Sequence, residues 1–193
     1  MDINLIIVAV YSYLLGCIPF GLILTKIFLK KDIRDIGSGN IGATNILRTG
    51  NKTIGYGTLF LDVIKAVFPI VYIKLNYPEY IFLASICVFI GHVFPLWLKF
   101  KGGKGVATYV GILFSINFSL GLVFVCVWLT VFIISKYSSL SSLFGSLGVP
   151  IYLLLFTQQN SIFFLIMFVF IFYTHRENIK RLKNKEETKT KIF

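Results

Sequence analysis

Long apolar segments alternate with short polar segments along the whole chain. A transmembrane helix needs about 20 mostly apolar residues, so this pattern predicts an all-α polytopic membrane helix bundle. Several segments are shorter than that, and the fourth and fifth could form one long span or a re-entrant element, which leaves five spans as an alternative to seven. The seven apolar segments cover about residues 3–29, 53–73, 80–98, 106–117, 119–135, 140–156 and 160–174.

The composition agrees with a chain that sits in lipid. Of its 193 residues, 56% are hydrophobic and 14% are charged, whereas an average soluble domain has about 25% charged residues. The first apolar segment follows Met1 and Asp2 and is longer than the core of a secretory signal, so we expect an uncleaved first helix. We expect one membrane domain over residues 1–182, followed by a charged cytoplasmic tail at residues 183–193 that frays.

Charge is distributed unevenly between the two sides of the predicted bundle. With seven spans, all but two of the 19 Lys and Arg residues lie on or next to one side; Lys74 lies on the other side and Lys65 lies within the second span. Cytoplasmic segments carry the excess of Lys and Arg, so we expect the N-terminus outside and the C-terminus in the cytoplasm. The net charge of +11 then reflects orientation and contact with anionic lipid, not nucleic-acid binding.

Three polar islands lie on this expected cytoplasmic side, and the first covers residues 37–48. Its small residues leave backbone N–H groups able to face a ligand. A helix that begins near Asn40 would place Thr44 and Asn45 on the same face as Arg48. A helix N-terminus suits a phosphate, and Arg48 would add a bidentate cation. A plain turn followed by a helix cap explains the same residues about as well.

The second island covers residues 100–105 and places Lys101 and Lys104 on either side of two glycines. This order lets the backbone and an ammonium group approach an anion together, although it does not match the GxxxxGK[ST] pattern of a P-loop. His92 lies upstream, near the inner end of the third segment. We expect His92 to pack between helices or to support the site, not to catalyse.

The third island covers residues 175–181, where His175 and Asn178 share a helix face. Lys180 and Arg181 suit a basic helix end near lipid headgroups, but His175 and Asn178 are not needed there. A serine-rich stretch at residues 138–142 lies on the same side. Its hydroxyls could bind a substrate, although capping of the next helix explains them at least as well.

Some polar and reactive residues fall inside the predicted spans. Asp62 and Lys65 are three residues apart in the second span, where charge is costly and often functional. Since neither lies near an island in the sequence, we favour a structural ion pair that faces the bundle interior. The three cysteines have no metal-ligand spacing, so we expect free thiols and no metal site: Cys17, Cys87 and Cys126.

Taken together, the islands resemble the three motifs of the PlsY family of bacterial acyl-phosphate:glycerol-3-phosphate acyltransferases. The resemblance is carried by GSGNIGATNILR at 37–48, by GHVFP at 91–95 with FKGGKG at 100–105, and by HRENIKR at 175–181. Length, segment order and motif order agree over nearly the whole chain. The serine-rich stretch matches less tightly and leaves the choice among Ser138, Ser139, Ser141 and Ser142 open.

The resemblance implies an enzyme of the bacterial inner membrane with seven helices, an active site that faces the cytoplasm, and neither a metal nor a cofactor. It implies transfer of a fatty acyl group from acyl phosphate to the 1-hydroxyl of sn-glycerol 3-phosphate, which gives lysophosphatidic acid and phosphate in the first acylation of phospholipid synthesis. Its partners would be these substrates, membrane lipid and an upstream enzyme that forms acyl phosphate, and we expect a monomer.

The resemblance also assigns roles to residues of this sequence. The catalytic residues would be Ser38, Lys104, His175 and Asn178. Glycerol 3-phosphate would be bound by Ser38, Arg48, Lys104, Ser139, Ser142 and Asn178. Acyl phosphate would be bound by Gly39, Asn40, Gly42, Thr44, Asn45, Gly102, Gly103 and His175.

Two alternatives remain at this stage. His175 could act as a general base or only bind phosphate, since acyl phosphate is already activated and its oxygens could accept the hydroxyl proton. A small transporter or flippase for an anionic lipid would share the basic loops, but it would be expected to place polar groups at broken helices in mid-membrane. Clustering of the islands at one interface favours the enzyme.

Overall fold

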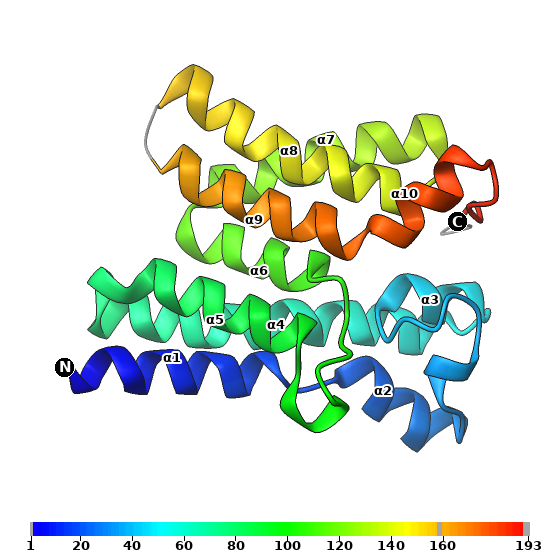
Figure 1. Ribbon diagram of the computed structural model, residues 1–193, viewed down its shortest axis with the longest axis horizontal. Helices are drawn as coiled ribbons and strands as arrows, with labels where there is room; N and C mark the ends of the chain where they lie inside the picture. Colours follow the sequence, from blue (N-terminus) through cyan, green and yellow to red (C-terminus); the bar gives the residue numbers. More distant parts are fainter. Residues whose placement is uncertain (1, 158–159, 191–193) are drawn as a thin grey trace. The chain divides into compact units, whose positions relative to one another are not determined.

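The computed structural model describes residues 2–157 and 160–190, and within these residues the chain is helical and contains no β-strand (Figure 1). The α-helices are α1 (Ile3–Gly16), α2 (Phe20–Leu24), α3 (Ala43–Arg48), α4 (Lys52–Asn76), α5 (Ile81–Val93), α6 (Val106–Ile116), α7 (Phe118–Ser135), α8 (Ser138–Phe156), α9 (Ser161–Thr174) and α10 (Arg176–Lys183). Short helical turns lie at Thr25–Leu29, Ile33–Asp35, Pro78–Tyr80 and Leu96–Leu98.

Each of the seven predicted apolar segments contains a helix, so the all-α prediction is confirmed. Four stretches are long and apolar enough to cross a membrane: Ile3–Leu29, Pro78–Leu98, Phe118–Ser135 and Ser138–Phe156. A fifth arises if α9 and α10, bent by 62°, form one span. Because α4 carries two charged residues in its interior and α6 has only 11 residues, the count of seven spans stays a prediction.

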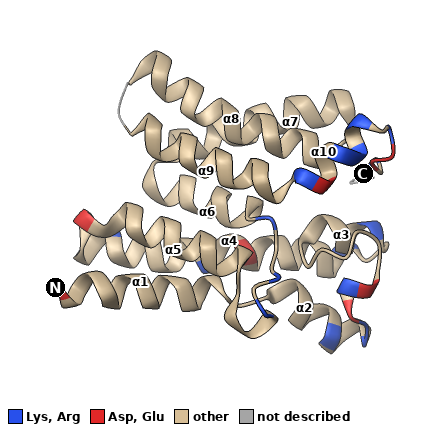
Figure 2. Cartoon of the chain, in the orientation of Figure 1, with Lys and Arg blue, Asp and Glu red and all other residues tan. Residues whose placement is uncertain are grey.

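The chain divides into two compact units, Met1–Ile116 and Asn117–Phe193. In the first unit α1 packs on α5, and α4 packs on α3, α5 and α6. In this unit most Lys and Arg residues lie around α2, α3 and the loop before α6, and acidic residues lie both there and near the N-terminus (Figure 2). α6 and α7 are separate helices, since Asn117 is extended and caps α7 through a hydrogen bond to Ser119 N (2.8 Å).

The first apolar segment of this unit is a broken helix. α1 ends at Gly16, and Pro19 precedes α2. A break inside lipid leaves backbone carbonyls that need donors. Trp97 Nε1 donates to Cys17 O at 2.6 Å, and Lys65 Nζ donates to Ile18 O at 2.7 Å. Side chains of the same unit therefore satisfy both carbonyls at the break.

In the second unit α8 packs on both α7 and α9, and α10 contacts α8 and α9. His175 ends α9, and α10 begins at the next residue. Contrary to the expectation from sequence, the charged tail is bonded to the rest of this unit over residues 184–190, while residues 191–193 lie outside the described residues. Its backbone returns to the start of α8, where Thr190 N donates to Lys136 O at 3.0 Å.

Candidate functional site

A buried asparagine shapes the loop of the first island. Gly37 and Gly39 have φ angles of +61° and +70°, which glycine adopts without strain. The Asn45 side chain is 2% exposed, and its Oδ1 accepts a hydrogen bond from Ser38 N at 2.9 Å. Its Nδ2 donates at 2.9 Å to the carbonyls of both Ile36 and Asn40. Since this amide is used to build the loop, Asn45 fits a scaffold role better than the predicted acyl-phosphate contact.

The helix after this loop begins later than the sequence indicated. α3 starts at Ala43 with Gly42 as its N-cap, not near Asn40, because Asn40 Oδ1 accepts from Gly42 N at 2.9 Å and forms a turn there. Thr44 and Arg48 still lie one turn apart on α3, and both are half-buried. Ser38 is exposed on the loop.

An exposed ion pair stands just before the same loop. Arg34 Nε and Nη2 donate to the two carboxylate oxygens of Asp32 at 2.9 and 2.6 Å, and Lys26 Nζ lies 3.5 Å from the same carboxylate. The hydrogen bond from Arg34 holds the pKa of Asp32 well below its usual range. Asp32 thus stays a carboxylate and neutralises part of the positive charge beside the loop.

The loop of the second island is anchored to the end of α5. Gly102 N donates to Val93 O at 3.0 Å, and Gly103 N donates to His92 O at 3.1 Å. Helix-end carbonyls thus take the N–H groups of the two glycines for which an anion contact was predicted. Lys104, which directly follows Gly103, is half-buried.

In the third island, the backbone holds the ring of His175 in place. The side chain is 3% exposed, and Nδ1 lies 2.8 Å from Ile171 O. A carbonyl oxygen only accepts hydrogen bonds, so Nδ1 carries a proton. The ring is thus oriented by the backbone of α9.

The carboxylate of Glu187, a tail residue that the sequence analysis did not select, binds three side chains of this unit. Glu187 Oε1 accepts from Asn178 Nδ2 at 2.9 Å and from Ser139 Oγ at 3.1 Å, while Oε2 accepts from Arg181 Nε at 2.7 Å. Burial acts to raise the pKa of Glu187, but these hydrogen bonds and the Arg181 charge outweigh it and lower the pKa. No sequence motif marked Glu187, because the contact depends on the tail folding back.

The serine hydroxyls are not equivalent. Ser141 Oγ donates to Tyr137 O and Ser142 Oγ donates to Ser138 O, both at 2.8 Å, as serines in helices often do. Ser142 Oγ also accepts from Trp128 Nε1 at 3.2 Å, a contact the sequence did not indicate. Ser139 differs, since its hydroxyl reaches Glu187 and, through it, Asn178.

The predicted residues thus form two groups, one in each unit. The first unit carries Ser38, Gly39, Asn40, Gly42, Thr44, Asn45, Arg48, Gly102, Gly103 and Lys104, on two separate loops and α3. The second unit carries Ser139, Ser142, His175 and Asn178, and there Glu187 brings Ser139 and Asn178 together.

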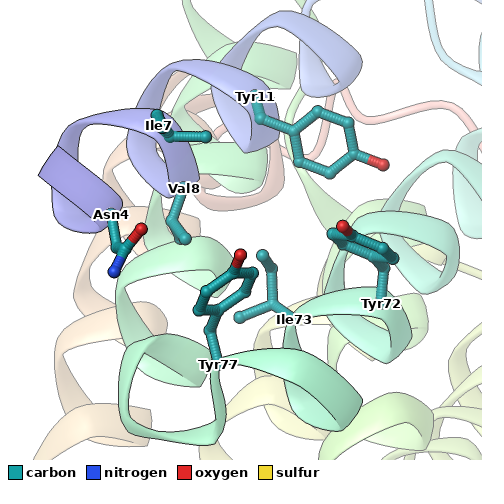
Figure 3. A pocket seen from close by; sticks show the side chains of 7 residues that line it. All are labelled: Asn4, Ile7, Val8, Tyr11, Tyr72, Ile73 and Tyr77. Carbon is teal, nitrogen blue, oxygen red and sulfur yellow. The ribbon is translucent and has the colours of Figure 1, made fainter.

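One groove of about 340 Å³ is lined by none of these residues. It lies in the first unit between the start of α1 and the end of α4, and the rings of Tyr11, Tyr72 and Tyr77 border it together with Asn4 (Figure 3). Tyrosines at a membrane interface commonly form such a belt. Over residues 2–157 and 160–190, no three His, Cys, Asp or Glu side chains are grouped to hold a metal ion.

The comparisons with known proteins point to one family. A family model described as glycerol-3-phosphate acyltransferase matches residues 6–185. Similar proteins of that name occur in Pelagibacter ubique, 77% identical with 97% of this chain and 98% of the relative covered, and in Mesorhizobium japonicum, 46% identical with 94% of each covered.

Two crystal structures of PlsY, an integral membrane glycerol 3-phosphate acyltransferase, share the fold. The glycerol 3-phosphate form has a TM-score of 0.91 at 32% identity and covers 97% of this chain and 96% of its own. The lysophosphatidic acid form has a TM-score of 0.88 at 31% identity and covers 98% and 96%. The resemblance drawn from the motifs is confirmed, and the chain belongs to the glycerol-3-phosphate acyltransferase family.

Proposed function

We propose that the acyl donor is acyl phosphate and that the reaction takes place at the cytoplasmic face of the bacterial inner membrane. The protein is a membrane acyltransferase that acylates glycerol 3-phosphate to lysophosphatidic acid. The observation that carries this function is the match to PlsY along nearly the whole chain, since those structures are its glycerol 3-phosphate and lysophosphatidic acid forms. The cytoplasmic side is supported by the concentration of Lys and Arg in the island segments.

The proposed reaction balances with its two substrates alone. The 1-hydroxyl oxygen attacks the acyl carbon, the bond between that carbon and the phosphate oxygen breaks, and the departing phosphate takes the hydroxyl proton. The products are lysophosphatidic acid and inorganic phosphate. Holding two substrates in reactive positions can supply about 7–11 kcal/mol of the barrier, so positioning is the main task of the site.

The positioning roles proposed here are those that the motifs assign to single residues. Lys104 and Arg48 supply the positive charge for the phosphate of the acceptor, and Asn178 orients its hydroxyls while Ser139 holds that amide through Glu187. The loop that carries Ser38 and the ring of His175 would hold the acyl phosphate and the oxyanion that develops on it.

The role of His175 can be tested directly. The hydrogen bond from Nδ1 to Ile171 O orients the ring, and in a neutral ring of this orientation Nε2 is the nitrogen that a general base would use. A substrate-assisted reaction predicts that His175→Gln keeps kcat within about 10-fold of the native value at saturating substrate, whereas loss of a general base costs about 100-fold or more. Single-turnover acyl transfer, measured separately from substrate binding, decides between the two.

A broken helix is also a feature of transporters, which place polar groups at such breaks. The structure does not favour that function. Lys65 and Trp97 occupy the carbonyls at the break, so the groups that would coordinate a transported ion are already used. The decisive experiment is phosphate release from acyl phosphate by detergent-purified protein. Release that depends on glycerol 3-phosphate supports the enzyme, and its absence in a folded sample refutes acyl phosphate as donor.

We further propose seven spans, an external N-terminus, a cytoplasmic C-terminus and a monomer. Single cysteines in a variant that lacks Cys17, Cys87 and Cys126 test the topology. A cysteine at residue 101 should react with an impermeant reagent only from the cytoplasmic side, and one at residue 76 only from outside. Light scattering in detergent tests the monomer.

A further inference from the structure

We propose that a buried cluster of Asp62, Lys65 and His92 positions the loop that carries Lys104, and so tunes binding of glycerol 3-phosphate. The inference rests on the proposed function, in which Lys104 contacts the phosphate of that substrate. It gives the charged residues inside the bundle a role that the sequence analysis did not assign, since there they were only a structural pair.

The first step is the ion pair on α4. Asp62 and Lys65 lie one turn apart, with Lys65 Nζ 2.8 Å from Asp62 Oδ1 and with side chains 2% and 4% exposed for Lys65 and Asp62. A buried ion pair is an expensive way to hold helices together, because apolar side chains of similar volume often do so as well or better. Its presence inside an apolar helix therefore points to a task besides packing.

The second step is the contact of the pair with His92. Nδ1 of His92 lies 3.8 Å from Asp62 Oδ1, and the imidazole is 4% exposed. Among the described residues, this nitrogen has no hydrogen-bond partner. The Asp62 carboxylate is thus the charged neighbour toward which the ring is turned, and it biases the ring to keep its Nδ1 proton on that side.

The third step is the contact of His92 with the loop. The opposite ring nitrogen, Nε2, faces Gly103 so closely that any Cβ at residue 103 would overlap the ring. The backbone carbonyl of His92 accepts from Gly103 N, and a Cβ at Gly102 would overlap that same carbonyl. The loop therefore lies directly on the His92 ring and backbone, and only glycine fits at both positions.

Lys104 follows Gly103 directly, about 3.8 Å away along the backbone. Gly105, on its other side, is also fixed, because it has a φ of +85° and a Cβ there would overlap the Phe89 ring. A change in the plane of the His92 ring must move Gly103, and with it the lysine. Asp62 and Lys65 are thus positioning residues that act through His92.

The test compares His92→Gln and the double variant Asp62→Leu/Lys65→Met with the control Lys74→Met. Lys74 lies on the same helix, but its Nζ donates to Ser115 O and Ile116 O at 2.9 and 3.0 Å, at the far end of α4. The double variant removes both buried charges together, so neither charge is left without its counter-ion. It also removes the donor to Ile18 O, so a lower unfolding midpoint by itself does not count against the inference. All proteins are purified in detergent, and kcat, both KM values and the unfolding midpoint are measured.

We expect His92→Gln and the double variant each to raise KM for glycerol 3-phosphate about 10-fold. Their kcat and their KM for acyl phosphate should stay within about 2-fold of the native values. All of these parameters should be unchanged in Lys74→Met. Hydrogen exchange at residues 99–105 should also be faster in both, because the loop amides lose their support. An unchanged KM for glycerol 3-phosphate together with native exchange at this loop overturns the inference. So does a parallel fall of kcat, both KM values and the unfolding midpoint, which indicates a purely structural pair. If native protein releases no phosphate, the proposed function fails instead, and hydrogen exchange still tests the positioning of the loop.

Discussion

Replacement of Glu187 by glutamine is the sharpest test of how the tail supports the site. The carboxylate accepts three hydrogen bonds, from Asn178, Ser139 and Arg181, and its side chain is 1% exposed. Glutamine has one accepting oxygen, so if this oxygen serves Asn178 and Ser139, its NH₂ group faces the donating Nε of Arg181. One buried donor then loses its partner, and the charge that assists the bond from Arg181 is gone.

The expected cost can be worked from these contacts. Hydrogen bonds to a charged group contribute about 1.5–3 kcal/mol, and the lower end applies because the Arg181 side chain is 33% exposed. We therefore expect Glu187→Gln to lower the free energy of unfolding of the second unit by about 1.5 kcal/mol. The bond from Asn178 then goes to a neutral amide oxygen instead of a carboxylate, so Asn178 is held less firmly and kcat/KM for glycerol 3-phosphate should also fall. The control is Glu186→Gln, since Glu186 is the exposed neighbour.

The stability difference between native protein and Glu187→Gln should depend on pH. The folded state lowers the pKa of Glu187 from its ordinary value of 4.5, so its carboxylate stabilises the protein above that value. The contribution is lost as pH falls through the lowered pKa. Thermal unfolding in detergent should show a gap between native protein and Glu187→Gln that is full at neutral pH and closes in acid. A gap that is absent at neutral pH, or that does not depend on pH, would refute the anchoring by Glu187.

Three further predictions concern single side chains. Asn45→Ala removes the partner of Ser38 N and of two loop carbonyls, so we expect a loss of about 1–3 kcal/mol in unfolding free energy, measured by thermal unfolding, and a higher KM for acyl phosphate. Lys104→Met should raise KM for glycerol 3-phosphate at least 10-fold in a steady-state assay, while Lys99→Met, which removes an exposed cation from the same loop, should change it less than 2-fold. Ser139→Ala should lower the unfolding free energy by about 1 kcal/mol, and Ser141→Ala, whose hydroxyl only bonds its own helix, by less than about 0.5 kcal/mol.

The helices followed from the sequence because hydrophobic segments fold locally in lipid, where every backbone group must find its partner within the chain. The break at Cys17 and Ile18 did not follow. Its carbonyls are satisfied by Trp97 and Lys65, which are distant in sequence, and no local pattern reports such a pairing. Tail folding was missed for the same reason, since the charge run around Glu187 is typical of a solvated segment.

The sequence indicated which residues belong to the islands, but it indicated less well what each residue contacts. Gly102 and Gly103 were expected to offer N–H groups to an anion, but both donate to the end of α5 instead. Glycine-rich spacing indicates only that a backbone approaches something closely, and here the approach is to His92 rather than to a ligand. The spacing therefore predicted the close approach and could not say which partner was approached.

The polar residues of the islands differ in how deeply they are buried. Asn45 and Asn178 are each 2% exposed, and the hydrogen bonds of their amides go to the protein itself, to the first loop and to Glu187. Ser38 is exposed, and Lys104 is only half-buried. A buried amide that already has its partners can exchange them for a substrate only if those partners move, because an unpaired buried group costs about 1–3 kcal/mol. Asn45 holds a loop shaped by two glycines in the left-handed region, so we expect its bonds to persist and Asn45 to support the site without touching substrate. Asn178 holds a carboxylate from the tail, an anionic group like the phosphate of glycerol 3-phosphate, so we expect that of the two only Asn178 can exchange its partner for a substrate without dismantling its loop.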